Sequence, residues 1–164
     1  VAELRAMGLA VYFVTNNSRA TTSDLQRKLK SMSIDADLDE IWSSVRACAH
    51  VVRGLGRAMV VGSAALKAAV AAQGVEVWPD DDEVEAGRRA GALDVLATYD
   101  VPAVDVVVLG MDPGWSYFDV ALASVACREH GARIVCTSRD FNYPAAGGRL
   151  LPGNGALVAA VVDA

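Results

Sequence analysis

The stretch LAVYFVTNNSR, residues 9–19, decides the fold that we expect for this chain. Residues 9–14 are apolar and mostly branched or aromatic, which is typical of a strand that is buried on both faces. The run stops at Thr15, and Asn16 and Asn17 follow. Ligands bind at the carboxyl ends of strands in open α/β sheets, so these polar groups and the nearby backbone N–H groups predict an oxyanion site, most plausibly for phosphate. Asn is also a common turn residue, so an ordinary strand-to-helix turn is the alternative.

The composition bounds the class of protein. With 164 residues, 53% hydrophobic and 21% charged, the chain is long enough for one core, or for a small domain and part of another. A net charge of −5 argues against a nucleic-acid surface. The sequence lacks a run of 18 apolar residues, so we expect no membrane partner. Its three cysteines have no metal-ligand spacing and predict free thiols in a reducing cytoplasm.

Beyond residue 19, helical and strand patterns alternate. Strands are predicted at 41–44, 57–63, 75–78, 105–109 and 133–137, and helices at 23–32, 45–55, 64–73, 116–129 and 156–164. We expect Ser23 and Gln26 to form the capping box of the first of these helices. This alternation predicts an α/β fold with a parallel sheet in three layers.

Two segments look irregular. The acidic run at Asp80–Glu85 is interpreted as a solvated loop, with a short helix through Thr98 after it. Residues 139–155 are rich in Gly, Pro and Asn and are interpreted as a long loop, whose length suggests a function.

Two motifs resemble one known family. VYFVTNNSR, residues 11–19, is similar to the second motif of haloacid dehalogenase (HAD) superfamily phosphatases, in the branch of NagD-like, phosphoglycolate- and pyridoxal-phosphate-type enzymes. CTSRDFNYPAAGGRLLPGNGALVAAV, residues 136–161, resembles the large α/β cap of that branch. The resemblance implies that residues 1–45 are part of a Rossmann-like core and that residues 46–164 form the cap, which selects the substrate.

The resemblance also implies a function. Such an enzyme removes phosphate from a small phosphorylated metabolite through an aspartyl-phosphate intermediate, and it requires Mg²⁺. The family places its nucleophilic Asp at the end of a buried strand in an hhhhDxD motif, and adds a Lys and a late acidic pair for the metal. Asp35, Asp37 and Asp39 follow no buried strand, and Asp112 has no partner carboxylate two residues later.

The chain therefore looks like a fragment that is inactive alone, because the nucleophile, the Lys and the metal ligands lie outside it. A non-enzymatic anion-binding module or pseudo-phosphatase is the alternative. The family also makes a homodimer through the cap an expectation.

The family's roles are carried over to matched positions. By this resemblance, Thr15 is expected to hydrogen-bond the transferring phosphoryl group, Asn16 to contact the phosphate and Asn17 to order the loop. In the cap, the segment with Arg139, Asp140 and Tyr143 hangs over the site and selects the leaving group.

Each cap residue has a plainer alternative. In the alternative, Asp140 only stabilises its turn, because Asp is a good turn former. Tyr143 then packs under its own loop, and Arg139 is exposed to solvent without a role in binding. The Gly153–Gly155 segment (GNG) lacks the third glycine and the preceding strand of a dinucleotide fingerprint, so we interpret it as a helix entry that fixes the cap's return to the core.

Overall fold

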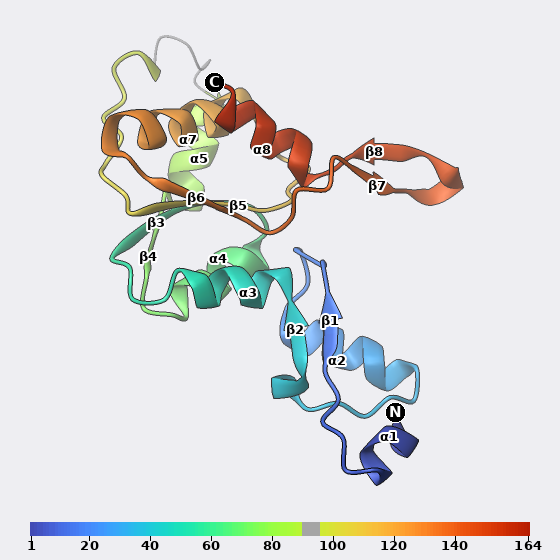
Figure 1. The fold of residues 1–164 in the computed structure, drawn as a ribbon. Helices are drawn as coiled ribbons and strands as arrows, with labels where there is room; N and C mark the ends of the chain where they lie inside the picture. Colours follow the sequence, from blue (N-terminus) through green and yellow to red (C-terminus); the bar gives the residue numbers. More distant parts are fainter. Residues whose placement is uncertain (90–95) are drawn as a thin grey trace.

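The computed structural model describes residues 1–89 and 96–164. Its centre is a four-stranded sheet in the order β4-β3-β5-β6, in which every pairing is parallel. The strands are β3 (Arg57–Val61), β4 (Glu76–Trp78), β5 (Val106–Leu109) and β6 (Arg133–Cys136). The predicted parallel α/β arrangement is therefore confirmed (Figure 1).

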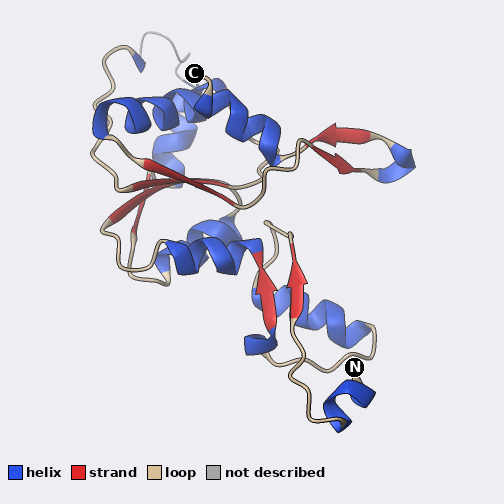
Figure 2. Ribbon diagram, in the orientation of Figure 1, coloured by secondary structure: helices blue, strands red, loops and turns tan. Residues whose placement is uncertain are grey.

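Helices cover both faces of this sheet, which makes three layers (Figure 2). One face carries α3 (Ser44–Val51) and α4 (Ala64–Ala71), and the other carries α5 (Asp81–Arg89), α7 (Tyr117–His130) and α8 (Asn154–Val162). Helix α3 is shorter than the predicted 45–55, and α8 begins two residues earlier than predicted. None of the described helices is both long and apolar enough to cross a membrane.

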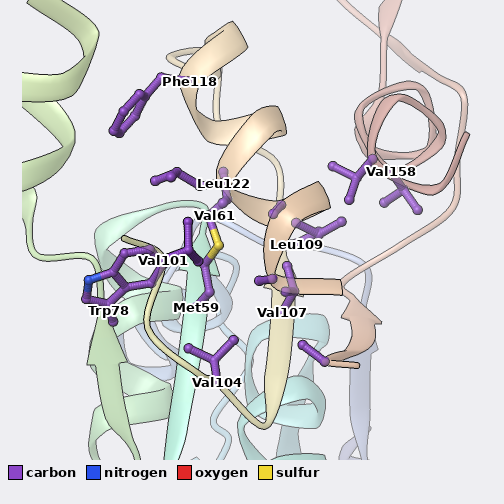
Figure 3. Close-up of a cluster of buried hydrophobic side chains, with 14 residues drawn as sticks. Met59, Val61, Trp78, Val101, Val104, Val107, Leu109, Phe118, Leu122 and Val158 are labelled. Carbon is purple, nitrogen blue, oxygen red and sulfur yellow. The ribbon is translucent and has the colours of Figure 1, made fainter. Parts of the chain in front are cut away.

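The core divides along the central strand β5, whose four residues are fully buried. Because side chains alternate across a strand, Val107 and Leu109 pack toward α7 and α8 (Figure 3), and Val106 and Val108 pack toward α3 and α4. Phe118 and the other large side chains of α7 complete the first cluster. This continuous burial explains the unbroken apolar run from which the strand at 105–109 was predicted.

The first strand differs from its prediction. Strand β1 (Phe13–Thr15) is three residues long and pairs in parallel with β2 (Ile41–Ser43) in a separate two-stranded sheet. Only Phe13 packs against the small cluster under α2 (Thr22–Ser31), while Tyr12 is 63% and Val14 80% exposed. The prediction that this strand is buried on both faces is thus wrong, because one neighbouring strand and one helix cover only one face.

Two further predictions were wrong for identifiable local reasons. Helix α2 is capped by Thr21, not Ser23, because the Thr21 hydroxyl accepts from the Asp24 N–H while Asp24 accepts from the Thr21 N–H. The acidic run is the start of helix α5, where negative charge suits the helix N-terminus. The predicted helix through Thr98 lies partly outside the described residues.

The predicted loop at 139–155 contains a hairpin of β7 (Asn142–Pro144) and β8 (Leu150–Pro152). A 3-10 turn at Ala146–Gly148 connects them, and its two glycines have φ of +75°. Glycine tolerates this conformation without a steric penalty, so a Gly- and Pro-rich sequence reverses direction here. The hairpin projects away from the layered body beside the start of α8 (Figure 1).

The remaining elements complete the chain. Helix α1 (Ala2–Ala6) ends before Gly8, whose φ is +76°. A 3-10 turn at Leu38–Glu40 leads into β2. The β1–β2 sheet lies to one side of the larger sheet, with the carboxyl ends of its strands directed toward the larger sheet (Figure 1).

Candidate functional site

The loop that follows β1 folds on its own side chains. The Oγ1 of Thr15 accepts from the Asn17 N–H at 3.2 Å. The Oδ1 of Asn17 accepts from the N–H groups of Arg19 and Ala20 at 2.9 and 2.8 Å. The side chain of Asn17 therefore shapes the turn between β1 and α2, while the amide of Asn16 extends away from it.

Serines from two other strand ends hold the same loop by its carbonyl oxygens. The Ser44 hydroxyl, which is buried, lies 3.1 Å from the carbonyl oxygens of both Asn16 and Asn17. The Ser63 hydroxyl donates to the Ser18 carbonyl at 3.0 Å. Sequence reasoning missed these serines. The available signal was that Ser44 and Ser63 come just after β2 and β3, and the carboxyl ends of strands are where such side chains converge.

A pocket of about 340 Å³ lies between this loop and residues of the 138–154 segment. Asn16, Asn17 and Arg19 line one side, and Asp140 and Tyr143 line the other. The remaining lining residues are Ser18, Met111, Ser138, Gly153 and Asn154. The pocket joins residues more than 120 positions apart in the sequence.

One contact crosses this pocket directly. The Nδ2 of Asn16 lies 3.5 Å from the Oδ2 of Asp140. Four of the six predicted residues thus meet at one pocket, namely Asn16, Asn17, Asp140 and Tyr143. The other two do not line it: Thr15 faces a neighbouring pocket, and Arg139 is exposed.

Arg19 is a pocket residue that sequence reasoning did not select. Its exposed guanidinium and the amide of Asn16 are hydrogen-bond donors, which suit an anion. On the opposite side, the carboxylate of Asp140 is an acceptor for hydroxyl groups. The pocket is therefore equipped to hold a molecule that carries an anionic group at one end and hydroxyl groups at the other.

The side of the pocket that carries Asp140 is built on the GNG segment. The N–H of Gly153 donates to the Phe141 carbonyl at 2.6 Å, and the N–H of Gly155 donates to the Asp140 carbonyl at 2.9 Å. Gly153 is the N-cap of α8, so the interpretation of GNG as a helix entry is confirmed. The side chain of Asn154 between them is 3% exposed.

The second pocket beside Thr15, of about 360 Å³, is lined by both Cys48 and Cys136. Burial, and to a smaller extent Cys136, raises the pKa of the Cys48 thiol to about 11. A thiol with this pKa stays protonated at neutral pH and is a poor nucleophile. Cys48 is therefore a core residue, and its free thiol agrees with the prediction from the cysteine spacing.

A metal centre is absent from the described part of the chain. In residues 1–89 and 96–164, no three side chains of His, Cys, Asp or Glu come close enough to hold an ion together. His130 lies 2.7 Å from the Val101 carbonyl and the ring of His50 contacts that of Trp42, so both histidines have structural contacts. The Mg²⁺ that the resemblance implies is not assigned to residues of this chain.

Comparison with known proteins places the chain in a family. Residues 1–76 match the haloacid dehalogenase-like hydrolase family, and the parallel α/β fold and the Thr15–Asn17 loop agree with that match. The chain belongs to the HAD superfamily.

Relatives of known name match nearly all of this HAD chain. It is 31% identical to an acid sugar phosphatase of Staphylococcus haemolyticus, over 91% of this chain and 49% of the relative. It is 30% identical to that of Staphylococcus aureus, over 96% of this chain and 53% of the relative. The chain thus spans about half the length of the curated relatives that it matches.

Solved structures give the same result. The crystal structure of Bs-TpNPPase superposes with a TM-score of 0.78 at 28% identity, over 99% of this chain and 58% of that one. The glycerol phosphate phosphatase Rv1692 of Mycobacterium tuberculosis, in complex with magnesium, superposes with a TM-score of 0.72 at 27% identity, over 98% and 44%. The fold of this chain is therefore that of HAD phosphatases.

Proposed function

We propose that this chain is part of a HAD phosphatase that removes phosphate from a small phosphorylated metabolite. The observation that carries the proposal is the pocket in which Asn16 meets Asp140. In this proposal residues 1–45 supply the phosphate-binding loop of the core, and residues 46–164 are the cap that contacts the leaving group.

The roles of the pocket residues follow from their chemistry. The Asn16 amide and the Arg19 guanidinium bind the phosphoryl oxygens in the pocket, and the Thr15 hydroxyl binds them from the adjoining pocket, because each is a hydrogen-bond donor. Asn17 fixes the loop that presents them. Asp140 and Tyr143 contact the organic part of the substrate, and the exposed Arg139 attracts anionic substrates toward the cap.

The substrate class is proposed from the relatives' names and from the pocket. Acid sugar phosphatases and a glycerol phosphate phosphatase are among the similar proteins. Both kinds of substrate named there carry hydroxyl groups, which suit the carboxylate of Asp140. We therefore propose a sugar phosphate or a polyol phosphate as the substrate.

Mg²⁺ is the proposed cofactor of the complete enzyme, since a related phosphatase structure contains magnesium. Its ligands, the nucleophilic Asp and the Lys would come from segments outside this chain. We also propose a cytoplasmic location, where the free thiols at Cys48, Cys127 and Cys136 stay reduced. Exposed apolar side chains on the hairpin, such as Phe141 and Leu150, support the proposal of a homodimer through the cap.

The decisive experiment starts from the complete gene. Its product is assayed for phosphate release from glucose 6-phosphate, glycerol 3-phosphate and p-nitrophenyl phosphate, with Mg²⁺ or with EDTA. We expect Mg²⁺-dependent release, and a fall in kcat/KM of at least about 100-fold in Asn16→Ala, in line with the loss of a transition-state hydrogen-bond donor. Lys30→Ala, at an exposed position of α2, is the control and keeps the wild-type value. Binding of phosphate without turnover in the wild type would instead support the anion-binding module.

A further inference from the structure

We propose that Asn154 is a positioning residue, which holds the Arg139–Asn142 segment so that Asp140 faces Asn16 across the pocket. This inference rests on the proposed function for its kinetic consequence, and on the structure alone for its geometry. Asn154 belongs to the GNG segment at the start of α8, which resembles a dinucleotide fingerprint only superficially.

The side chain of Asn154 joins the ends of two neighbouring strands. Its Nδ2 lies 3.1 Å from the carbonyl oxygen of Leu109, the last residue of β5, and 2.9 Å from the carbonyl oxygen of Ser138, just beyond β6. It also lies 3.4 Å from the Thr137 Oγ1. The Asn154 Oδ1 makes no hydrogen bond within the described chain, so donation by Nδ2 is what fixes this buried amide.

The two glycines bring the backbone of α8 against the same segment. A Cβ on Gly155 would overlap the carbonyl oxygen of Arg139 and lie 2.7 Å from its carbonyl carbon. A Cβ on Gly153 would lie 3.2 Å from the Asn142 nitrogen. Only residues without a side chain allow this approach, which also forms the hydrogen bonds from Gly153 and Gly155 to the segment.

Asp140 depends on this arrangement for its place. Its side chain is exposed, and the contact with Asn16 at 3.5 Å is long. A contact of this length cannot by itself hold a loop. The backbone on both sides of Asp140 is instead held from α8, with Ser138 bonded to Asn154 and the carbonyl of Asp140 bonded to Gly155.

The position of the Asp140 carboxylate in the pocket is therefore set by Asn154, which lines the pocket but is almost entirely buried. Asn154 would act on the reaction through Asp140, by fixing where the hydroxyl groups of the leaving group are received. Because productive geometry is sensitive to displacements of about 1 Å, a loosened segment should reduce catalysis even with every reacting group present.

The test uses Asn154→Asp, which keeps the shape of the side chain and removes both N–H donors. Its control is Val158→Ala, one turn further along α8, which removes two methyl groups from the core at a position that does not line the pocket. We expect both variants to lower the melting temperature, so a difference between them in pocket geometry or in kcat/KM reports more than lost stability.

Two measurements are made. Crystal structures of the 164-residue chain give the Asn16–Asp140 separation, which we expect to increase by more than about 1 Å in Asn154→Asp and to stay unchanged in Val158→Ala. In the complete protein, we expect Asn154→Asp to lower kcat/KM for glycerol 3-phosphate by at least about tenfold. The fall for p-nitrophenyl phosphate, whose leaving group has no hydroxyl groups for Asp140 to bind, is expected to be smaller, so that the ratio of the two values changes.

The outcomes separate the two proposals. An unmoved segment in Asn154→Asp, or an equal change of the substrate ratio in both variants, overturns the positioning role. If the wild-type protein hydrolyses no phosphate ester, the proposed function fails, while the crystal structures still decide whether Asn154 positions Asp140.

Discussion

Replacing Gly155 with Ala tests whether the close approach between α8 and the Arg139–Asp140 backbone is real. The added Cβ would lie 2.7 Å from the Arg139 carbonyl carbon and 3.0 Å from that of Asp140. Unstrained carbon atoms prefer separations of about 3.5–4.0 Å, so the backbone must move by roughly 0.8 Å. Both neighbours are main-chain atoms, which cannot turn away as a flexible side chain does.

The expected magnitude is the difference between two opposing effects. Overpacking of this kind costs about 1–3 kcal/mol, and the rigid neighbours place this site in the upper part of that range. Ala is also the better helix former, by up to about 1 kcal/mol in a helix interior. The net loss of stability is therefore about 1–2 kcal/mol, which corresponds to a fall in Tm of about 2–8 °C for a chain of this size.

The assay is thermal unfolding of the 164-residue chain, followed by circular dichroism. Ala160→Gly, at an exposed position of the same helix, measures the helix-propensity effect separately and should lower Tm. If propensity alone mattered, Gly155→Ala would raise Tm. An increase in Tm for Gly155→Ala would refute the reasoning, because the strain inferred from the structure would then be absent.

Three further predictions concern other parts of the chain. Thr21→Ala removes the N-cap of α2 and should cost about 1 kcal/mol, seen as a lower midpoint of urea unfolding with an unchanged slope. Leu66→Ala, at a fully buried position of α4, should cost about 2–5 kcal/mol; a loss below 1 kcal/mol would contradict its packing against the central sheet. Cys48 should react with iodoacetamide at pH 8 far more slowly in the native chain than in urea, as measured by mass spectrometry. The pKa of the Cys48 thiol is about 11 in the folded chain, against an ordinary value of 9.0, so on raising the pH the thiol ionises in the unfolded chain before it does in the folded chain. Its contribution to stability is therefore complete below pH 9 and declines from pH 9 to 11.

Local patterns were sufficient for most of the fold. The apolar run Val106–Leu109 predicted a buried central strand, since a strand covered on both faces needs no polar alternation. The glycines at 74 and 131 marked helix ends, because both adopt positive φ. Where two local signals competed, as at Thr21 and Ser23, the stronger reciprocal capping box determined the helix start.

For the candidate site, sequence patterns identified chemistry but could not say which groups meet. The sequence by itself indicated a donor-rich loop at Thr15–Asn17, and its resemblance to HAD phosphatases implied that the segment around Asp140 faces the site. Only the tertiary structure decided that Asn16 faces Asp140 and that Thr15 lies in the adjoining pocket. It also decided that Asn154 hydrogen-bonds the carboxyl ends of both β5 and β6. The physical reason is that these relations depend on how parallel strands and α8 pack in three dimensions, and residues more than 100 positions apart carry no local signal of that packing.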